Sequence, residues 1–135
     1  MKYFNERIQY DDLKGKQQEI YNFQKVSAHL ADYGYTTIKL DDDWMGADFI
    51  AIHFDGIKYL KVQLKGRLWF DKKYIGKDIF ICFFEKEWFI YPHDELLKIF
   101  ESEIQNTSSW IEKGLYHYPK LTSKNLKRLT DYIVK

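Results

Sequence analysis

The stretch Gly46–Arg67, GADFIAIHFDGIKYLKVQLKGR, decides the fold. Two apolar-rich runs, 49–54 and 57–64, flank the dipeptide Asp55-Gly56. Asp-Gly between two strand-like runs is the strongest short-range signal for a β-hairpin. The pattern therefore predicts two antiparallel strands joined by a two-residue type I′ turn.

This turn sets a register in which Phe54 faces Ile57. Counting outward, the predicted pairs are Ile52 with Tyr59, Ile50 with Lys61, and Asp48 with Gln63. Directly opposite side chains share a face and lie about 5 Å apart at Cβ. Lys65 points to the same face as Gln63, because strands alternate with period two. A carboxylate, an amide and an ammonium group are thus expected to converge at the open end of the hairpin.

The types of these three residues suggest a metal site. Asp48 offers an anionic oxygen and Gln63 a neutral amide oxygen, and both suit Mg²⁺, which takes oxygen ligands and keeps waters for substrate phosphates. Lys65 can hold a water or stabilise negative charge on a phosphate. The three residues together indicate metal-assisted hydrolysis of a phosphodiester.

The predicted helix at 15–33 adds a fourth candidate, Glu19, one turn before Phe23 on the apolar stripe. A carboxylate there has two readings: it favours the helix dipole, or it points at something cationic. If this helix packs across the same sheet face, Glu19 adds a metal ligand or an outer contact.

A helix with Glu19 followed by Asp48, Gln63 and Lys65 across a hairpin resembles the PD-(D/E)XK nuclease superfamily, which has the restriction-endonuclease-like fold. The segments KVQLKGR and Tyr91–Leu96, with the strand pair between them, look most like the branch of group I intron-encoded homing endonucleases. The resemblance covers roughly residues 15–100. Gln63 stands where an acidic residue is commoner, which removes one negative charge from the metal site.

The resemblance implies an α/β fold with a mixed central β-sheet flanked by helices on both sides. It implies a DNA endonuclease that depends on Mg²⁺ (or Mn²⁺). Lys65 would be the catalytic lysine and Glu19 an auxiliary acid. The metal ligands would be Asp48, Gln63, the main-chain carbonyl of Leu64 and Glu19.

Composition fits a single domain over residues 1–135. Hydrophobic residues make up 45% and charged residues 30%, which is typical of a folded globular chain and excludes a disordered one. The net charge of +1 conceals a segregation of basic residues behind the hairpin. Four of them are candidates for DNA phosphate contacts: Arg67, Lys72, Lys73 and Lys77. They interleave with Trp69, Phe70 and Tyr74, which either stack on exposed bases or pack inward from a folded basic loop.

The sequence signals for other functional residues are weaker than the one at the hairpin. The only cysteine, Cys82, lies in an apolar run and reads as a buried hydrophobe. His29, His53 and His93 lack a zinc-ligand spacing and read as surface or capping residues. Asp41–Asp43 either binds a cation or forms a solvated turn. The N-terminus lacks the apolar core of a signal peptide and no apolar run reaches membrane-spanning length, so we expect a cytoplasmic protein.

The remaining elements are predicted from periodicity and turn residues. We expect a strand at 35–40, an acidic loop at 41–46, a surface loop or short helical turn at 66–78, a second hairpin at 79–84 and 88–91, a short helix from His93, and a last helix at about 124–134 with Leu126, Leu129 and Ile133 inward.

Two alternatives stay open beside the nuclease. One is a catalytically inactive nucleic-acid-binding module on the same fold. The other is a protein-interaction domain whose many aromatic residues form a partner surface. The expected partner is DNA, either branched or recognised by sequence. A homodimer is expected if both strands are cut, because one site cuts one strand.

Overall fold

In the computed structural model, which describes residues 2–44 and 46–135 except the side chains of 43 and 44, the central element is a six-stranded sheet. Its strand order is β1-β2-β3-β5-β6-β8, and β4 pairs with β7 in a second, two-stranded sheet. Strands β3 and β5 run parallel, whereas the other pairs are antiparallel. The strands are β1 (Tyr35–Trp44), β2 (Ala47–His53), β3 (Tyr59–Leu64), β4 (Leu68–Asp71), β5 (Ile79–Glu85), β6 (Glu87–Pro92), β7 (Leu115–Tyr118) and β8 (Ile133–Val134).

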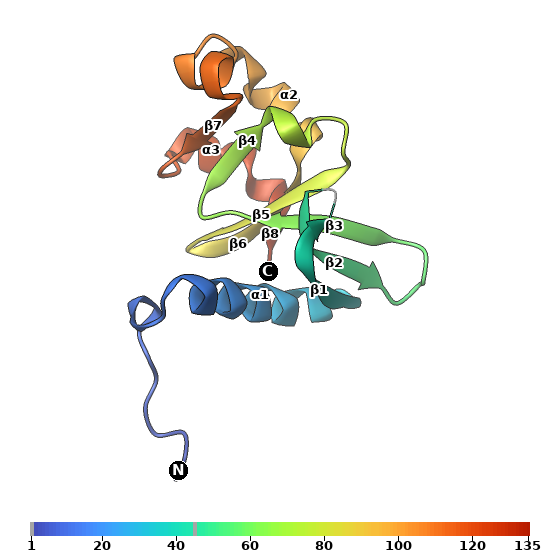
Figure 1. The fold of residues 1–135 in the computed structure, drawn as a ribbon, viewed down its shortest axis with the longest axis vertical. Coiled ribbons are helices and arrows are strands. Elements are labelled where there is room, and N and C mark those ends of the chain that lie inside the picture. The colour runs from blue at the N-terminus through green and yellow to red at the C-terminus, as the bar shows by residue number, and fades with distance from the viewer. Residues whose placement is uncertain (1, 45) are drawn as a thin grey trace.

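Helices cover both faces of the central sheet. The α-helices are α1 (Gly15–Ala31), α2 (His93–Ile104) and α3 (Ser123–Arg128), and the short turns of helix are η1 (Tyr10–Asp12), η2 (Lys72–Tyr74), η3 (Ser109–Lys113) and η4 (Thr130–Tyr132). Helix α1 lies along one side of the sheet, and α2 lies with the β4–β7 sheet on the other (Figure 1). The chain is therefore a mixed α/β protein with a mostly antiparallel central sheet flanked by helices, as predicted at this level.

The α1 face of the sheet has a core of its own. Val26 and Leu30 of α1 pack with Phe49 and Ala51 of β2, among other buried residues. At the start of the helix the side chain of Gln17 accepts a hydrogen bond from the main-chain N–H of Lys14 (3.1 Å). Its end is followed by Gly34 at a φ of 85°, a left-handed conformation that favours glycine. The predicted helix and its stop are confirmed.

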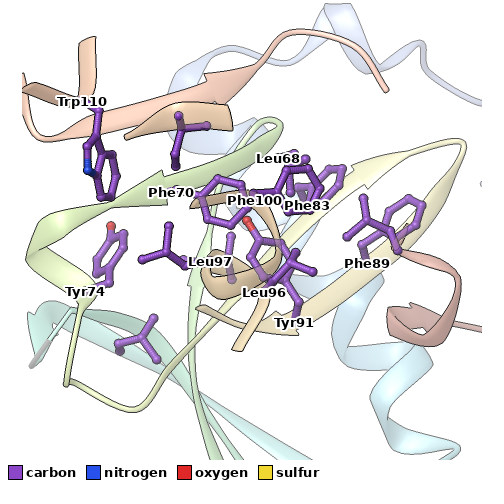
Figure 2. Close-up of a cluster of buried hydrophobic side chains, with 14 of the residues drawn as sticks. Leu68, Phe70, Tyr74, Phe83, Phe89, Tyr91, Leu96, Leu97, Phe100 and Trp110 are labelled. Atoms are coloured by element: carbon purple, nitrogen blue, oxygen red, sulfur yellow. The ribbon is translucent and has the colours of Figure 1, made fainter. Parts of the chain in front are cut away.

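The opposite face carries a larger, aromatic core. Ile81 and Phe83 of β5 enter it, whereas Cys82 between them joins the α1 core, as strand alternation requires. In Figure 2 the rings of Phe70 and Phe100 lie together, with centroids 5.2 Å apart. Burying an aromatic or aliphatic side chain contributes about 1.5–3 kcal/mol, so this cluster fixes α2 and β4 onto the sheet.

The predicted register of the first hairpin is confirmed, but its turn type is wrong. Ile52 pairs with Tyr59 and Ile50 with Lys61. The N–H of His53 donates to the carbonyl of Lys58 (2.9 Å), so the loop has four residues. Gly56 has a φ of 74°, but Asp55 is not at positive φ, as a type I′ turn requires.

The Asp55 carboxylate stabilises this wider loop instead. It accepts hydrogen bonds from the main-chain N–H groups of Ile57 (2.8 Å) and Lys58 (2.9 Å). These two bonds are the main reason that the pKa of Asp55 falls to about 2. A two-residue and a four-residue loop centred on the same peptide bond leave the same strand register, so the pairs were predicted correctly.

Two segments predicted as loops are strands. Strand β1 continues through the acidic run to Trp44, with an irregularity between Lys39 and Trp44. The segment 66–78, predicted as a surface loop or short helical turn, contains η2, which confirms the turn. It also contains β4, which was not predicted, because Leu68 and Phe70 are buried in the aromatic core. The suggestion that Asp41–Asp43 binds a cation involves the side chain of Asp43, which lies outside the described residues.

The second hairpin and the helix from His93 are confirmed, but the last predicted helix ends early. Helix α3 stops at Arg128, and Leu126, expected inside, is 45% exposed. Leu129 is buried as expected, but Ile133 belongs to β8 and pairs with Phe89 of β6. Sheet pairing of the chain end therefore replaces the last helical turns. No helix in the part of the chain that the structure describes is long and apolar enough to cross a membrane.

Candidate metal centre

Asp48 and Gln63 lie on neighbouring strands and on the same face of the sheet. The pair Phe49–Val62 next to them sets Asp48 opposite Gln63. Phe49 and Val62 both belong to the core beneath α1, so their neighbours Asp48 and Gln63 point to the opposite face. The structure thus brings together the first two residues of the predicted site.

The amide oxygen of Gln63 is buried and accepts no hydrogen bond from any described residue. Buried polar atoms in folded proteins almost always have a partner. Leaving such an acceptor unsatisfied costs about 1–3 kcal/mol. An unpartnered acceptor oxygen beside a carboxylate is a donor set that a hard cation can use.

Asp48 is oriented by the end of β3. Its Oδ2 accepts a hydrogen bond from the main-chain N–H of Leu64 (2.8 Å). In a strand the N–H and C=O of one residue point toward the same neighbour, so the Leu64 carbonyl lies on the Asp48 side. The three oxygens named as metal ligands on β2 and β3 therefore belong to one corner of the sheet.

Lys65, the third residue of the predicted site, directly follows the last residue of β3. Its N–H donates to the carbonyl of Cys82 (2.8 Å), which extends the ladder between β3 and β5 by one step. Its ammonium lies 4.6 Å from the ring centre of Trp69 and 5.7 Å from that of Tyr74. Cation–π attraction at these distances holds the charge on the face that carries Gln63.

Trp69 is a residue of this site that the sequence did not reveal as such. Its ring stacks on His117 of β7, with centroids 4.6 Å apart and an interplanar angle of 12°. The Tyr91 hydroxyl donates to the Trp69 carbonyl (2.6 Å) and accepts from its N–H (3.0 Å). Burial raises the pKa of Tyr91, so this hydroxyl stays protonated and can make both bonds. The signal available in the sequence was only that an aromatic residue follows Lys65 closely.

Glu19 does not lie on the face of the sheet that carries Asp48 and Gln63. Its carboxylate pairs with Lys16 (3.9 Å) and Lys39 (3.8 Å), and its side chain is 46% exposed. Since Glu19 lies on α1, it approaches the sheet from the face opposite to Asp48 and Gln63. It does line one cleft with Leu64 and Lys65, so a role for Glu19 at the site stays a prediction.

The four basic residues predicted to bind DNA lie in the segment beyond Lys65. Lys72, Lys73 and Lys77 are exposed and Arg67 is partly buried. Their aromatic neighbours Phe70 and Tyr74 are buried, so these two rings pack inward and are not available for stacking on bases.

The buried His93 holds this basic segment in place. Its Nε2 accepts from the N–H of Asp71 (3.0 Å), so Nδ1 carries the proton and donates to Asp94 (2.9 Å). Asp94 in turn accepts from the N–H of Gly76 (2.8 Å). The expectation that His93 is a surface or capping residue is wrong in one respect, because its side chain is fully buried.

Other candidates for chemistry are weak here. No group of three or more His, Cys, Asp and Glu side chains is placed to hold a metal ion among the described residues. Burial raises the pKa of the Cys82 thiol, so the thiol is not a ready nucleophile.

Comparison of the chain with models of protein families, with curated proteins and with solved structures found no match.

Proposed function

We propose that this chain is a Mg²⁺-dependent DNA endonuclease with a restriction-endonuclease-like fold, acting in the cytoplasm. The single observation that carries the proposal is the buried, unpartnered amide oxygen of Gln63 opposite the Asp48 carboxylate. Oxygen donors of this kind fit a hard divalent cation, which would also remove the cost of the unsatisfied oxygen. Asp48, Gln63 and the Leu64 carbonyl would hold the ion.

In this proposal the bound cation supplies Lewis-acid polarisation of a phosphate oxygen and of a water. Asp48 contributes the negative charge of the ligand set and Gln63 a neutral oxygen. Lys65 orients the attacking water or stabilises the charge that develops on the phosphate. The water oxygen would bond to phosphorus and give up one proton to solvent, while the bond to one ester oxygen breaks and that oxygen takes up a proton from solvent.

The exposed ammonium groups beyond β4 serve the same reaction by binding the DNA backbone. Lys72 and Lys73 lie on η2, which His93 and Asp71 hold against the body of the protein. Lysine and arginine contacts to phosphates fix the position of DNA without reading its sequence. Arg67 and Lys77 extend this basic surface at either end.

The test is cleavage of plasmid and branched DNA with Mg²⁺ or Mn²⁺. We expect the wild-type chain to cleave and Lys65→Ala to be inactive. Lys58→Ala is the matched control, because it removes the same charge at the far end of the hairpin. Absence of cleavage by the wild type, or full activity of Lys65→Ala, would contradict the assignment.

Asp48→Asn separates metal binding from structure. The amide oxygen of asparagine can still accept the Leu64 N–H, so folding should be preserved while metal binding and cleavage are lost. Light scattering in the presence of DNA checks the homodimer that double-strand cleavage would require.

A second candidate is a DNA-binding module without catalysis. The observation that favours it is the neutral Gln63, together with the pairing of the Glu19 carboxylate with lysines. It predicts DNA binding that weakens steeply with salt and survives Asp48→Ala in the absence of metal.

A further inference from the structure

A cleft of about 770 Å³ lies between α1 and the end of the central sheet. Its volume is within the range of about 300–1,000 Å³ that is usual for ligand pockets. Residues 64–66, the last residue of β3 and the two that follow it, form part of its wall. The cleft therefore meets the candidate metal centre at the end of β3, from the face of the sheet opposite to Asp48 and Gln63.

The floor of the cleft is aromatic. Phe84 and Trp88 pair across β5 and β6, with ring centroids 5.1 Å apart and planes at 57°. Trp88 is 6% exposed, whereas Phe84 is 51% exposed although it is on the face of the sheet that α1 covers. The open side of Phe84 is thus an aromatic surface that a flat ring can cover.

The facing wall is mixed, since Tyr21 and the Glu19 carboxylate line it beside polar and basic side chains of α1. Gln18, Asn22 and Lys25 line the cleft from successive turns of α1, and a spacing of three or four residues places them on one side of the helix. Asn22 also donates to the Tyr10 hydroxyl (2.9 Å), which fixes η1 at the end of the cleft. Side-chain amides offer both donors and acceptors, and Lys25 adds a positive charge.

We propose that this cleft binds an unpaired nucleotide of the DNA, with its base on Phe84 and its phosphate near Lys25. The inference rests on the proposed function and names its substrate class: DNA with a single-stranded extension or branch beside the cleaved bond. A base inside a duplex is covered by its neighbours and can reach such a floor only after it leaves the stack. Stacking on an aromatic side chain tolerates any base, because every base has a flat face.

The experiment measures binding in EDTA, so that cleavage plays no part. The probe is a short duplex with a 5′ or a 3′ single-stranded extension, carrying 2-aminopurine at the first unpaired position. The comparison is a blunt duplex of the same length with 2-aminopurine paired. We expect tighter binding of one extended duplex, with quenched fluorescence, and a loss of roughly tenfold in its affinity for Phe84→Ala, as for other bases stacked on aromatic side chains.

Three controls complete the design. Phe84→Tyr keeps the ring and should bind like the wild type. Phe54→Ala removes an 83% exposed ring at the hairpin turn and should change nothing. Deoxyadenosine monophosphate at the same concentration as the extended duplex should not displace it. Displacement under that condition would overturn the proposal in favour of a free nucleotide.

Each failure points to one claim. Equal affinity for extended and blunt duplexes, or an unchanged preference in Phe84→Ala, overturns the inference even if the protein cleaves DNA. Preferential binding that depends on Phe84, without cleavage in Mg²⁺, keeps the inference and removes the proposed nuclease activity.

Discussion

Replacing Gln63 by methionine tests the unsatisfied oxygen on which the metal site depends. Methionine has nearly the length of glutamine and lacks the buried acceptor. If no donor reaches that oxygen, its removal should relieve a cost of about 1–3 kcal/mol. In metal-free buffer the free energy of unfolding of Gln63→Met should therefore equal or exceed that of the wild type, by up to this amount.

Metal should shift the balance of stability toward the wild type. A ligand that binds only the folded state at ten times its dissociation constant stabilises it by about 1.4 kcal/mol. For a domain of this size, 1 kcal/mol corresponds to a shift of about 4 °C in the unfolding temperature. We expect Mg²⁺ to raise the unfolding temperature of the wild type and to leave that of Gln63→Met unchanged.

Thermal and urea unfolding, each with EDTA and with Mg²⁺, are the assays. Gln63→Glu serves as the opposite change: it should be less stable than the wild type in EDTA, because two carboxylates face each other, and should gain more from Mg²⁺. Loss of more than about 1 kcal/mol by Gln63→Met in EDTA would contradict a net cost of burying this amide. A rise in the unfolding temperature of Gln63→Met with Mg²⁺ as large as that of the wild type would refute the ligand role.

Three further predictions concern the framework of the site. Tyr91→Phe should cost about 1–3 kcal/mol in urea unfolding, because it leaves a buried N–H and C=O of β4 unpaired, whereas Tyr59→Phe at an exposed ring should cost nothing measurable. Hydrogen bonding to Arg128 lowers the pKa of Glu103 from 4.5 to about 2. The ionised Glu103 therefore stabilises the folded state above pH 4.5, and this stabilisation is lost as the pH falls through about 2. Glu103→Gln should flatten the acid limb of the stability curve and cost about 1 kcal/mol or less at pH 7, since solvent screens the pair; an unchanged acid limb would contradict this. Burial lowers the pKa of His93, so the unfolded state binds more protons and stability should fall as the pH drops below about 6.5, a dependence that calorimetry should find weakened in His93→Gln.

The first hairpin shows what local sequence determines. The pairing of Ile50 with Lys61 followed from period-two alternation about Asp55-Gly56. The turn type did not follow, because a four-residue loop stabilised by the Asp55 carboxylate preserves the same register. Prediction of Asp48 opposite Gln63 was therefore independent of the error in the turn.

Strand β4 shows what local sequence leaves open. Its partner β7 lies more than forty residues later, and Phe70 pairs there with Tyr116. Nothing near residues 66–78 signals that pairing, so four basic residues and two glycines favoured a loop. Only the burial of Leu68 and Phe70 in the aromatic core makes a strand of this segment.

The candidate site was predictable in its residues more than in its surroundings. Residue types and register pointed to Asp48, Gln63 and Lys65. The missing partner of Gln63 and the position of Lys65 over Trp69 depend on how α2 and the second sheet cover that face. Glu19 meets Lys39 because α1 packs on the other face of the sheet, and Lys16 lies one turn before Glu19 on α1 itself.

The most direct test of the metal centre is paramagnetic broadening by Mn²⁺ in the amide spectrum of the ¹⁵N-labelled protein. At substoichiometric Mn²⁺ we predict that broadening is centred on Asp48 and residues 63–65, and that Asp48→Asn abolishes it. Broadening centred elsewhere, or its persistence in Asp48→Asn, would contradict a divalent cation site between Asp48 and Gln63.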